Sequence, residues 1–227
     1  MATFVLLHGA GSDSWYWHLV EPELRARGHD TIAVDLPCDD NSAGLAEYTD
    51  AVVGVIGDRT DLVLVAQSMA GFTAPLVCER VPVSLMVLVA AMVPSPGEVV
   101  GDWWANTGHQ MPMAGEEFDP VTVFLHDVPT ELHAESMQHV RDQSGRPFED
   151  RWPLEGWPHV PTRFLLCRDD RFFPADFQRR VVRERLGIVP DEMDGGHLPA
   201  LSRPGQLADR LDHYWRELTD QPSGRPT

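Results

Sequence analysis

The sequence predicts an α/β fold, in which a mostly parallel, twisted sheet is flanked by helices. Short apolar segments of strand length alternate along the chain with longer amphipathic segments. Most of the short segments have a continuous apolar centre, as is typical of parallel strands that are buried on both faces. Six strands are therefore expected, over Thr3–His8, Thr31–Asp35, Leu62–Ala66, Ser84–Ala90, Thr162–Cys167 and Ile188–Met193.

The amphipathic segments beside these strands have the apolar spacing of helices that cover a sheet. They run over Ser14–Arg27, Gly44–Asp58, Ala70–Arg80, Ala175–Leu186 and Pro204–Leu218. Gly28 directly follows the first of them, at the position where a glycine commonly ends a helix. The last residues, 221–227, are expected to form a flexible tail.

The alternation is interrupted once, between Ser95 and Pro161. This stretch is rich in Trp, Met, His and Pro, and it contains two segments of helical character, Glu116–Phe124 and Thr130–Asp142. We expect it to form a small, mostly helical unit that is inserted before the last two strands. The chain of 227 residues is then one core, over 1–94 and 160–220, with an insertion over 95–159.

A serine stands at the end of the third expected strand. The apolar run leads through Gln67 to Ser68, and a helix-like stretch follows. A serine at such a strand–turn–helix junction is held in a strained backbone conformation, so the residues two positions away on either side must be small. Ala66 and Ala70 meet this demand, although the usual motif has glycine at both positions. The pattern is thus a weakened form of the nucleophile elbow of serine hydrolases.

Two further candidates complete the order Ser…Asp…His, which is the order expected with a nucleophile elbow. Asp170 follows the fifth expected strand, and His197 follows two glycines after the sixth. A serine hydroxyl is a weak nucleophile at neutral pH, so it needs a base, and the base needs an orienting carboxylate. His197 is the candidate base and Asp170 the candidate acid. Asp169 competes with Asp170 for that role, its alternative interpretation being a solvated loop charge.

These motifs together resemble the α/β-hydrolase superfamily and, within it, the compact plant methylesterase and hydroxynitrile lyase group. The resemblance covers most of residues 3–94 and 160–216. It is carried by His8-Gly9-Ala10, Gly28-His29-Asp30 leading into Val34-Asp35-Leu36, Gln67-Ser68-Met69-Ala70-Gly71, Val89-Ala90-Ala91-Met92-Val93-Pro94 and Gly196-His197. The resemblance implies the α/β-hydrolase fold, with the insertion serving as a small helical cap.

The resemblance also implies roles for single residues. The acid of this family lies four residues before a proline, which selects Asp170, before Pro174, over Asp169. The backbone N–H groups of Ala10 and Met69 would form the oxyanion hole. The candidate substrate-binding residues are Gly11, Trp104, Phe124, His126 and Leu198. For the aromatic side chains of the insertion, a place in a small core of the insertion itself is an equal alternative.

Composition restricts the partners and the compartment. The formal charge of −17 argues against nucleic acid and anionic membrane surfaces. No apolar run approaches the roughly 18 residues of a membrane span, and the chain starts almost directly with a strand, without the pattern of a signal peptide. Cys38, Cys78 and Cys167 are widely spaced and odd in number, which favours free thiols in the cytoplasm. We expect no metal and no cofactor. The oligomeric state stays open, with a homodimer among the options.

The leading hypothesis is a cofactor-independent serine hydrolase that cleaves a small, apolar carboxylic ester through an acyl-enzyme. One alternative is a non-hydrolytic enzyme of the same fold, a lyase or a biosynthetic enzyme of acyl-transfer or C–C bond chemistry. The hydroxynitrile lyases that the chain resembles depend on a lysine after the catalytic histidine, where this chain has Leu198. The other alternative is a ligand-binding receptor. The sequence leaves the acyl and alcohol groups open, and also the choice between ester, thioester and lactone.

Overall fold

The computed structural model describes residues 1–110 and 119–220, and it confirms the predicted α/β class of fold. The strands of this part form one sheet in the order β2-β1-β3-β4-β5-β6, and every neighbouring pair is parallel. Their bounds are β1 (Thr3–Leu7), β2 (Asp30–Val34), β3 (Leu62–Gln67), β4 (Leu85–Val89), β5 (Thr162–Cys167) and β6 (Asp191–Met193).

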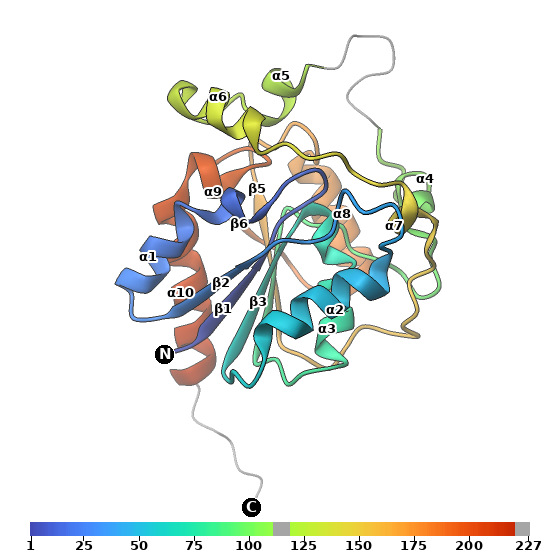
Figure 1. The fold of residues 1–227 in the computed structure, drawn as a ribbon, viewed down its shortest axis with the longest axis horizontal. Helices are drawn as coiled ribbons and strands as arrows, with labels where there is room; N and C mark the ends of the chain where they lie inside the picture. Colours follow the sequence, from blue (N-terminus) through green and yellow to red (C-terminus); the bar gives the residue numbers. More distant parts are fainter. Residues whose placement is uncertain (111–118, 221–227) are drawn as a thin grey trace, which may run out of the picture.

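Helices cover both faces of the sheet (Figure 1). On one face pack η1 (Ser14–Trp17), α1 (Val20–Ala26), α9 (Pro199–Ser202) and α10 (Pro204–Asp220). On the other face pack α2 (Leu45–Ile56), η2 (Ser68–Gly71), α3 (Ala74–Cys78) and α8 (Ala175–Leu186). Alternate strand residues belong to the two cores, so that Leu6 lies with α1 and α10 while Leu7 lies with α2 and α3. The central strands are therefore buried on both faces, as their apolar sequences predict.

The predicted helix over Thr130–Asp142 ends four residues early, at Gln138. Three other predicted elements are divided or lose several residues at their start, and a proline accounts for each. The helices predicted over Ser14–Arg27 and Ala70–Arg80 are each a 3-10 turn followed by a separate α-helix. Pro22 and Pro75 stand in the first turns of α1 and α3, which is where a residue without an N–H is tolerated. The last predicted strand loses its first three residues, because Pro190 cannot donate to the ladder and β6 begins directly after it.

The predicted insertion lies between β4 and β5, and the elements in its described part are short helical segments separated by loops. It contains η3 (Val100–Asp102), α4 (Trp103–Thr107), α5 (Pro120–Phe124), α6 (Thr130–Gln138) and α7 (Arg146–Glu149). Figure 1 shows α5 and α6 together above the sheet, at the edge where α9 also lies. The start of the predicted helix Glu116–Phe124 and the predicted tail 221–227 lie outside the described residues. The bounds 95–159 of the cap stay a prediction.

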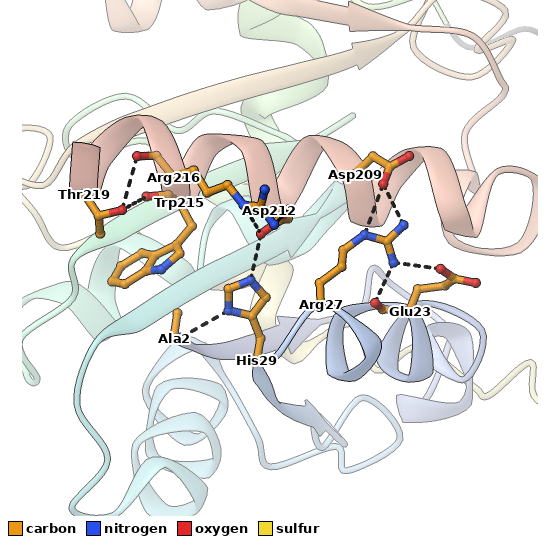
Figure 2. A network of polar contacts seen from close by, with 9 residues as sticks. All are labelled: Ala2, Glu23, Arg27, His29, Asp209, Asp212, Trp215, Arg216 and Thr219. Carbon is orange, nitrogen blue, oxygen red and sulfur yellow. Dashed lines mark hydrogen bonds and ion pairs between the residues drawn. The ribbon is translucent and has the colours of Figure 1, made fainter. Parts of the chain in front are cut away.

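A polar network joins the start of the chain to its last helix (Figure 2). The buried His29 ring accepts from the N–H of Ala2 at Nδ1 (3.2 Å), so its other nitrogen carries the proton and donates to Asp212 in α10 (2.9 Å). Beside it, the Arg27 guanidinium binds Glu23 and Asp209. These contacts fix β1 and the turn before β2 against α10. No helix in the described residues has both the length and the apolar character of a membrane span.

Candidate active site

Ser68 occupies a strained turn directly after β3, as the first residue of η2. Its backbone φ is +52°, in the left-handed region that L-residues other than glycine rarely adopt. Ala66 and Ala70 on either side are almost fully buried, so larger side chains would have no room there. The strain and the small neighbours are the features that the sequence pattern predicts for this serine.

The turn is held by the segment that follows β4. The N–H of Met92 donates to the carbonyl of Ser68 at 2.9 Å. A Cβ added to Gly71 would lie 1.9 Å from the carbonyl oxygen of Met92, which is far inside contact distance. Only glycine at position 71 therefore lets the two turns approach this closely.

The loop after β5 presents a fully buried carboxylate. Asp170 Oδ1 accepts from the backbone N–H groups of Phe172 and Phe173, both at 2.8 Å, which fixes the orientation of the side chain. Its Oδ2 faces the ring of His197. The side chain has no solvent exposure, and such a buried charge needs hydrogen-bond partners of this kind.

The ring of His197 lies between Asp170 and Ser68. Nδ1 is 2.8 Å from Asp170 Oδ2, and Nε2 is 3.1 Å from Ser68 Oγ. Because an ionised carboxylate can only accept, Nδ1 carries the proton and Nε2 is left to accept from the hydroxyl. The structure thus brings three residues predicted from the sequence into one hydrogen-bonded chain. Asp170 lies 27 positions before His197 in the sequence, and Ser68 lies 129 positions before it.

Asp169 hydrogen-bonds to the backbone of Gly195 instead of the imidazole of His197. Its Oδ2 accepts from the N–H of Gly195 at 3.1 Å, and its own N–H donates to the carbonyl of Gly195 at 3.0 Å. The two neighbouring aspartates therefore have separate tasks, one at the ring of His197 and one at the loop that carries it.

Aromatic rings surround the imidazole. The rings of Phe124, Phe172 and Phe173 have their centroids 5.5, 5.1 and 5.0 Å from that of His197. Of these, the sequence analysis named only Phe124. The signal for the other two was their place directly after the Asp170 turn, where the backbone that binds the carboxylate must also put its side chains beside the histidine.

A histidine and a glycine shape the loop after β1. His8 is buried, donates from Nδ1 to the carbonyl of Gly9 (2.8 Å) and accepts at Nε2 from the N–H of Leu36 (3.1 Å). Burial lowers the pKa of His8, consistent with a neutral ring in this arrangement. A Cβ on Gly9 would lie 2.4 Å from Gln67 Oε1 and 2.9 Å from Ser68 Cβ, so glycine lets this loop approach the serine.

A cavity of about 360 Å³ opens beside Ser68 and His197. Both predicted oxyanion residues, Ala10 and Met69, line it, and Met69 stands in the first turn of η2, where a helix leaves its N–H groups free. Four of the predicted substrate-binding residues also line it: Gly11, Trp104, Phe124 and Leu198. His126 is not in this lining and lies against Gly196 instead. Several other lining residues were not predicted from the sequence, among them Trp15, Tyr16, Met137, His139 and Leu201.

Neither a metal nor a cysteine offers a competing centre in the described part of the chain. No group of three or more His, Cys, Asp or Glu side chains there is arranged to hold a metal ion. Burial raises the pKa of Cys78 to about 12 and that of Cys167 well above its usual range, which disfavours the nucleophilic thiolate.

The model of the alpha/beta hydrolase family matches residues 4–210. The chain belongs to this family. It is 25% identical to norfluorocurarine synthase 1 of Strychnos over 96% of its length and 95% of the relative's, and 25% identical to methylesterase 1 of Arabidopsis thaliana over 96% of each chain. The crystal structure of polyneuridine aldehyde esterase superposes with a TM-score of 0.81 at 20% identity, over 94% of this chain and 99% of that one. The predicted likeness to the plant methylesterase group is confirmed.

The contact between Gly71 and Met92 predicts a sharp difference between two glycine substitutions. Gly71→Ala should destabilise the protein by about 1–3 kcal/mol or more, because the added methyl overpacks the turn. Gly54→Ala is the matched control: Gly54 is exposed within α2, and nothing lies within 4 Å of an added Cβ. It should be neutral or stabilise by about 0.5–1 kcal/mol. Urea unfolding measures both, and equal effects would contradict the close approach.

Proposed function

We propose that the protein is a cofactor-independent serine hydrolase that cleaves a small, apolar carboxylic ester through an acyl-enzyme. The observation that carries the proposal is the hydrogen-bonded chain from Ser68 through His197 to Asp170 beside a cavity, in a member of the alpha/beta hydrolase family. Relatives named methylesterase and a structural neighbour named polyneuridine aldehyde esterase support ester hydrolysis.

In the proposed reaction, Ser68 Oγ attacks the ester carbonyl while His197 Nε2 takes its proton. Asp170 keeps the other ring nitrogen protonated and stabilises the imidazolium that forms. The N–H groups of Ala10 and Met69 bind the oxyanion of the tetrahedral intermediate. His197 then protonates the departing alcohol, and the acyl group stays on Ser68. A water molecule, deprotonated by His197, cleaves the acyl-enzyme and releases the carboxylic acid.

The cavity favours a small, uncharged substrate. Its volume is near the lower end of the roughly 300–1,000 Å³ range of ligand pockets. Among the described residues, its lining is mainly apolar and aromatic and includes neither Lys nor Arg. Together with the net charge of −17, this makes an anionic substrate unfavourable.

A non-hydrolytic reaction at the same serine is the second candidate, because relatives from Strychnos are named norfluorocurarine synthases. The two candidates differ in their products. Hydrolysis releases one carboxylic acid and one alcohol per ester and incorporates oxygen from water into the acid. In H₂¹⁸O, label in the released acid supports hydrolysis, whereas a product without the label supports the alternative.

The nucleophile assignment is tested by Ser68→Ala. This variant removes only the hydroxyl oxygen, which is the attacking atom, so it should fold like the wild type and lose on the order of 10⁴-fold or more in kcat for a p-nitrophenyl ester. Circular dichroism checks the fold. Retention of wild-type kcat, with a contaminating esterase excluded, would sink the assignment.

The two aspartates predict an asymmetric pair of variants. Asp170→Asn should lower kcat by about 10⁴-fold, because an amide disfavours the Nδ1–H tautomer that His197 needs. Asp169→Asn keeps an oxygen that can accept from the N–H of Gly195, so its loss should stay below about tenfold, the worth of one weakened hydrogen bond. If Asp169→Asn is the more impaired variant, the roles assigned to the two carboxylates are reversed.

The aromatic side chains that line the cavity should determine which esters the protein accepts more than how fast a bound ester reacts. Truncating Trp104 or Phe124 to Ala should change kcat/KM unequally across p-nitrophenyl esters of increasing acyl bulk, because both rings line the cavity. Val121→Ala is the control, since Val121 lies on α5 with Phe124 but is exposed and not in the lining. A uniform loss across all esters, equal to that of the control, would mean that the rings only stabilise the insertion.

A further inference from the structure

The carboxylate of Asp127 reaches from the insertion to the backbone beside the catalytic histidine. Asp127 lies between α5 and α6, and its Oδ2 accepts from the N–H of Gly196 at 2.8 Å. Gly196 directly precedes His197 in the chain. A contact 69 positions apart in sequence therefore ends one residue from the proposed general base.

The double glycine before His197 has the conformation and the room that this contact requires. A Cβ on Gly196 would lie 2.6 Å from Asp127 Oδ1 and 2.7 Å from Nε2 of His126, so any other residue would push the insertion away. Gly195 has a φ of +122°, which glycine adopts without strain. The turn is thus shaped to accept the pair His126–Asp127 against it.

The loop that carries His197 is then held by side chains from three different parts of the fold. Asp169 binds the N–H of Gly195 (3.1 Å), Asp127 binds that of Gly196 (2.8 Å), and Gln67 donates to the carbonyl of His197 (3.0 Å). Two of these parts, the end of β3 and the loop after β5, also supply Ser68 and Asp170. The third is the insertion, which contributes no member of the Ser68–His197–Asp170 chain.

The contact of Asp127 is poorly suited to stability alone. Its other oxygen, Oδ1, is buried and has no hydrogen-bond partner among the described residues. A buried carboxylate oxygen without a partner costs free energy, so a fully paired or apolar contact would hold the insertion better. The residues that precede it, Phe124 and Leu125, line the cavity. The short segment 124–127 therefore lines the cavity and also binds the loop that carries His197.

We propose that Asp127 is a positioning residue, which fixes His197 through the N–H of Gly196. The reaction then depends on the contact between the insertion and the loop that carries His197. This inference rests on the proposed Ser68–His197–Asp170 mechanism. The hydrogen bond from Ser68 to His197 is 3.1 Å long, and a misplacement of about 1 Å in such a geometry can cost on the order of 10²-fold in rate.

The test compares Asp127→Ala with Asp127→Asn. The alanine variant removes the acceptor, and we expect kcat for a p-nitrophenyl ester to fall by about 10- to 100-fold with KM changed less than about threefold, since the histidine moves and the cavity wall stays. The asparagine variant keeps an oxygen that can accept from Gly196, so it should recover most of kcat.

Asp119→Ala is the matched control within the insertion. Asp119 caps α5 by accepting from the N–H groups of Val121 and Thr122, and it does not line the cavity. Losing this cap should lower Tm while kcat stays near wild type.

The outcomes separate this inference from the proposed function. Wild-type turnover that survives Ser68→Ala overturns both. If turnover depends on Ser68, the inference alone is overturned by an Asp127→Ala kcat within twofold of wild type, by an Asp127→Asn variant as impaired as the alanine, or by an equal loss in Asp119→Ala. A loss of kcat confined to Asp127→Ala, with rescue by asparagine, supports it.

Discussion

The contact between the turns after β3 and β4 sets the position of everything at the site. Ser68 holds a left-handed backbone conformation that costs about 1–3 kcal/mol for a residue other than glycine. The surrounding structure supplies this energy, because Met92 binds the carbonyl of Ser68 and the missing side chain of Gly71 lets the two turns meet. With its backbone fixed in this way, the hydroxyl of Ser68 lies within hydrogen-bond distance of the imidazole.

Parallel pairing brings the other groups to the same place. The carboxyl ends of parallel strands meet at one edge of a sheet, so the loops after β1, β3, β5 and β6 converge although they are distant in sequence. At that edge, three phenylalanine rings surround the buried contact of Asp170 with His197. Excluding water from a charged hydrogen bond strengthens it, which favours the proton transfer that the proposed mechanism requires.

The sequence predicts this frame well because local patterns determine it. Apolar runs indicate the central strands, which are buried on both faces, and the small residues around Ser68 indicate the strained turn. The choice of Asp170 over Asp169 came only from the resemblance and its proline four residues later, yet the structure places Asp170, and not Asp169, at the imidazole. Prolines explain three of the differences, because Pro22, Pro75 and Pro190 decide where α1, α3 and β6 can begin.

Contacts that depend on how distant segments meet were not predictable in the same way. Gly71 reads as an ordinary turn glycine until the carbonyl of Met92 is beside it. Asp127 reads as a loop charge, and only the fold places it against Gly196. His126 was predicted to line the cavity, but it lies against Gly196. The sequence could not show this, because no periodic pattern in the insertion indicates which side of the chain faces the cavity.

The central claim is that Ser68 is an activated nucleophile, and covalent labelling tests it most directly. A fluorophosphonate reacts rapidly with a serine whose proton a neighbouring base can take, and the phosphonyl group stays on the oxygen. The account predicts a single adduct by intact mass, mapped by peptide sequencing to Ser68, absent in Ser68→Ala and slowed in His197→Ala. Folded wild-type protein that forms no adduct, or forms it at another residue, would contradict the account.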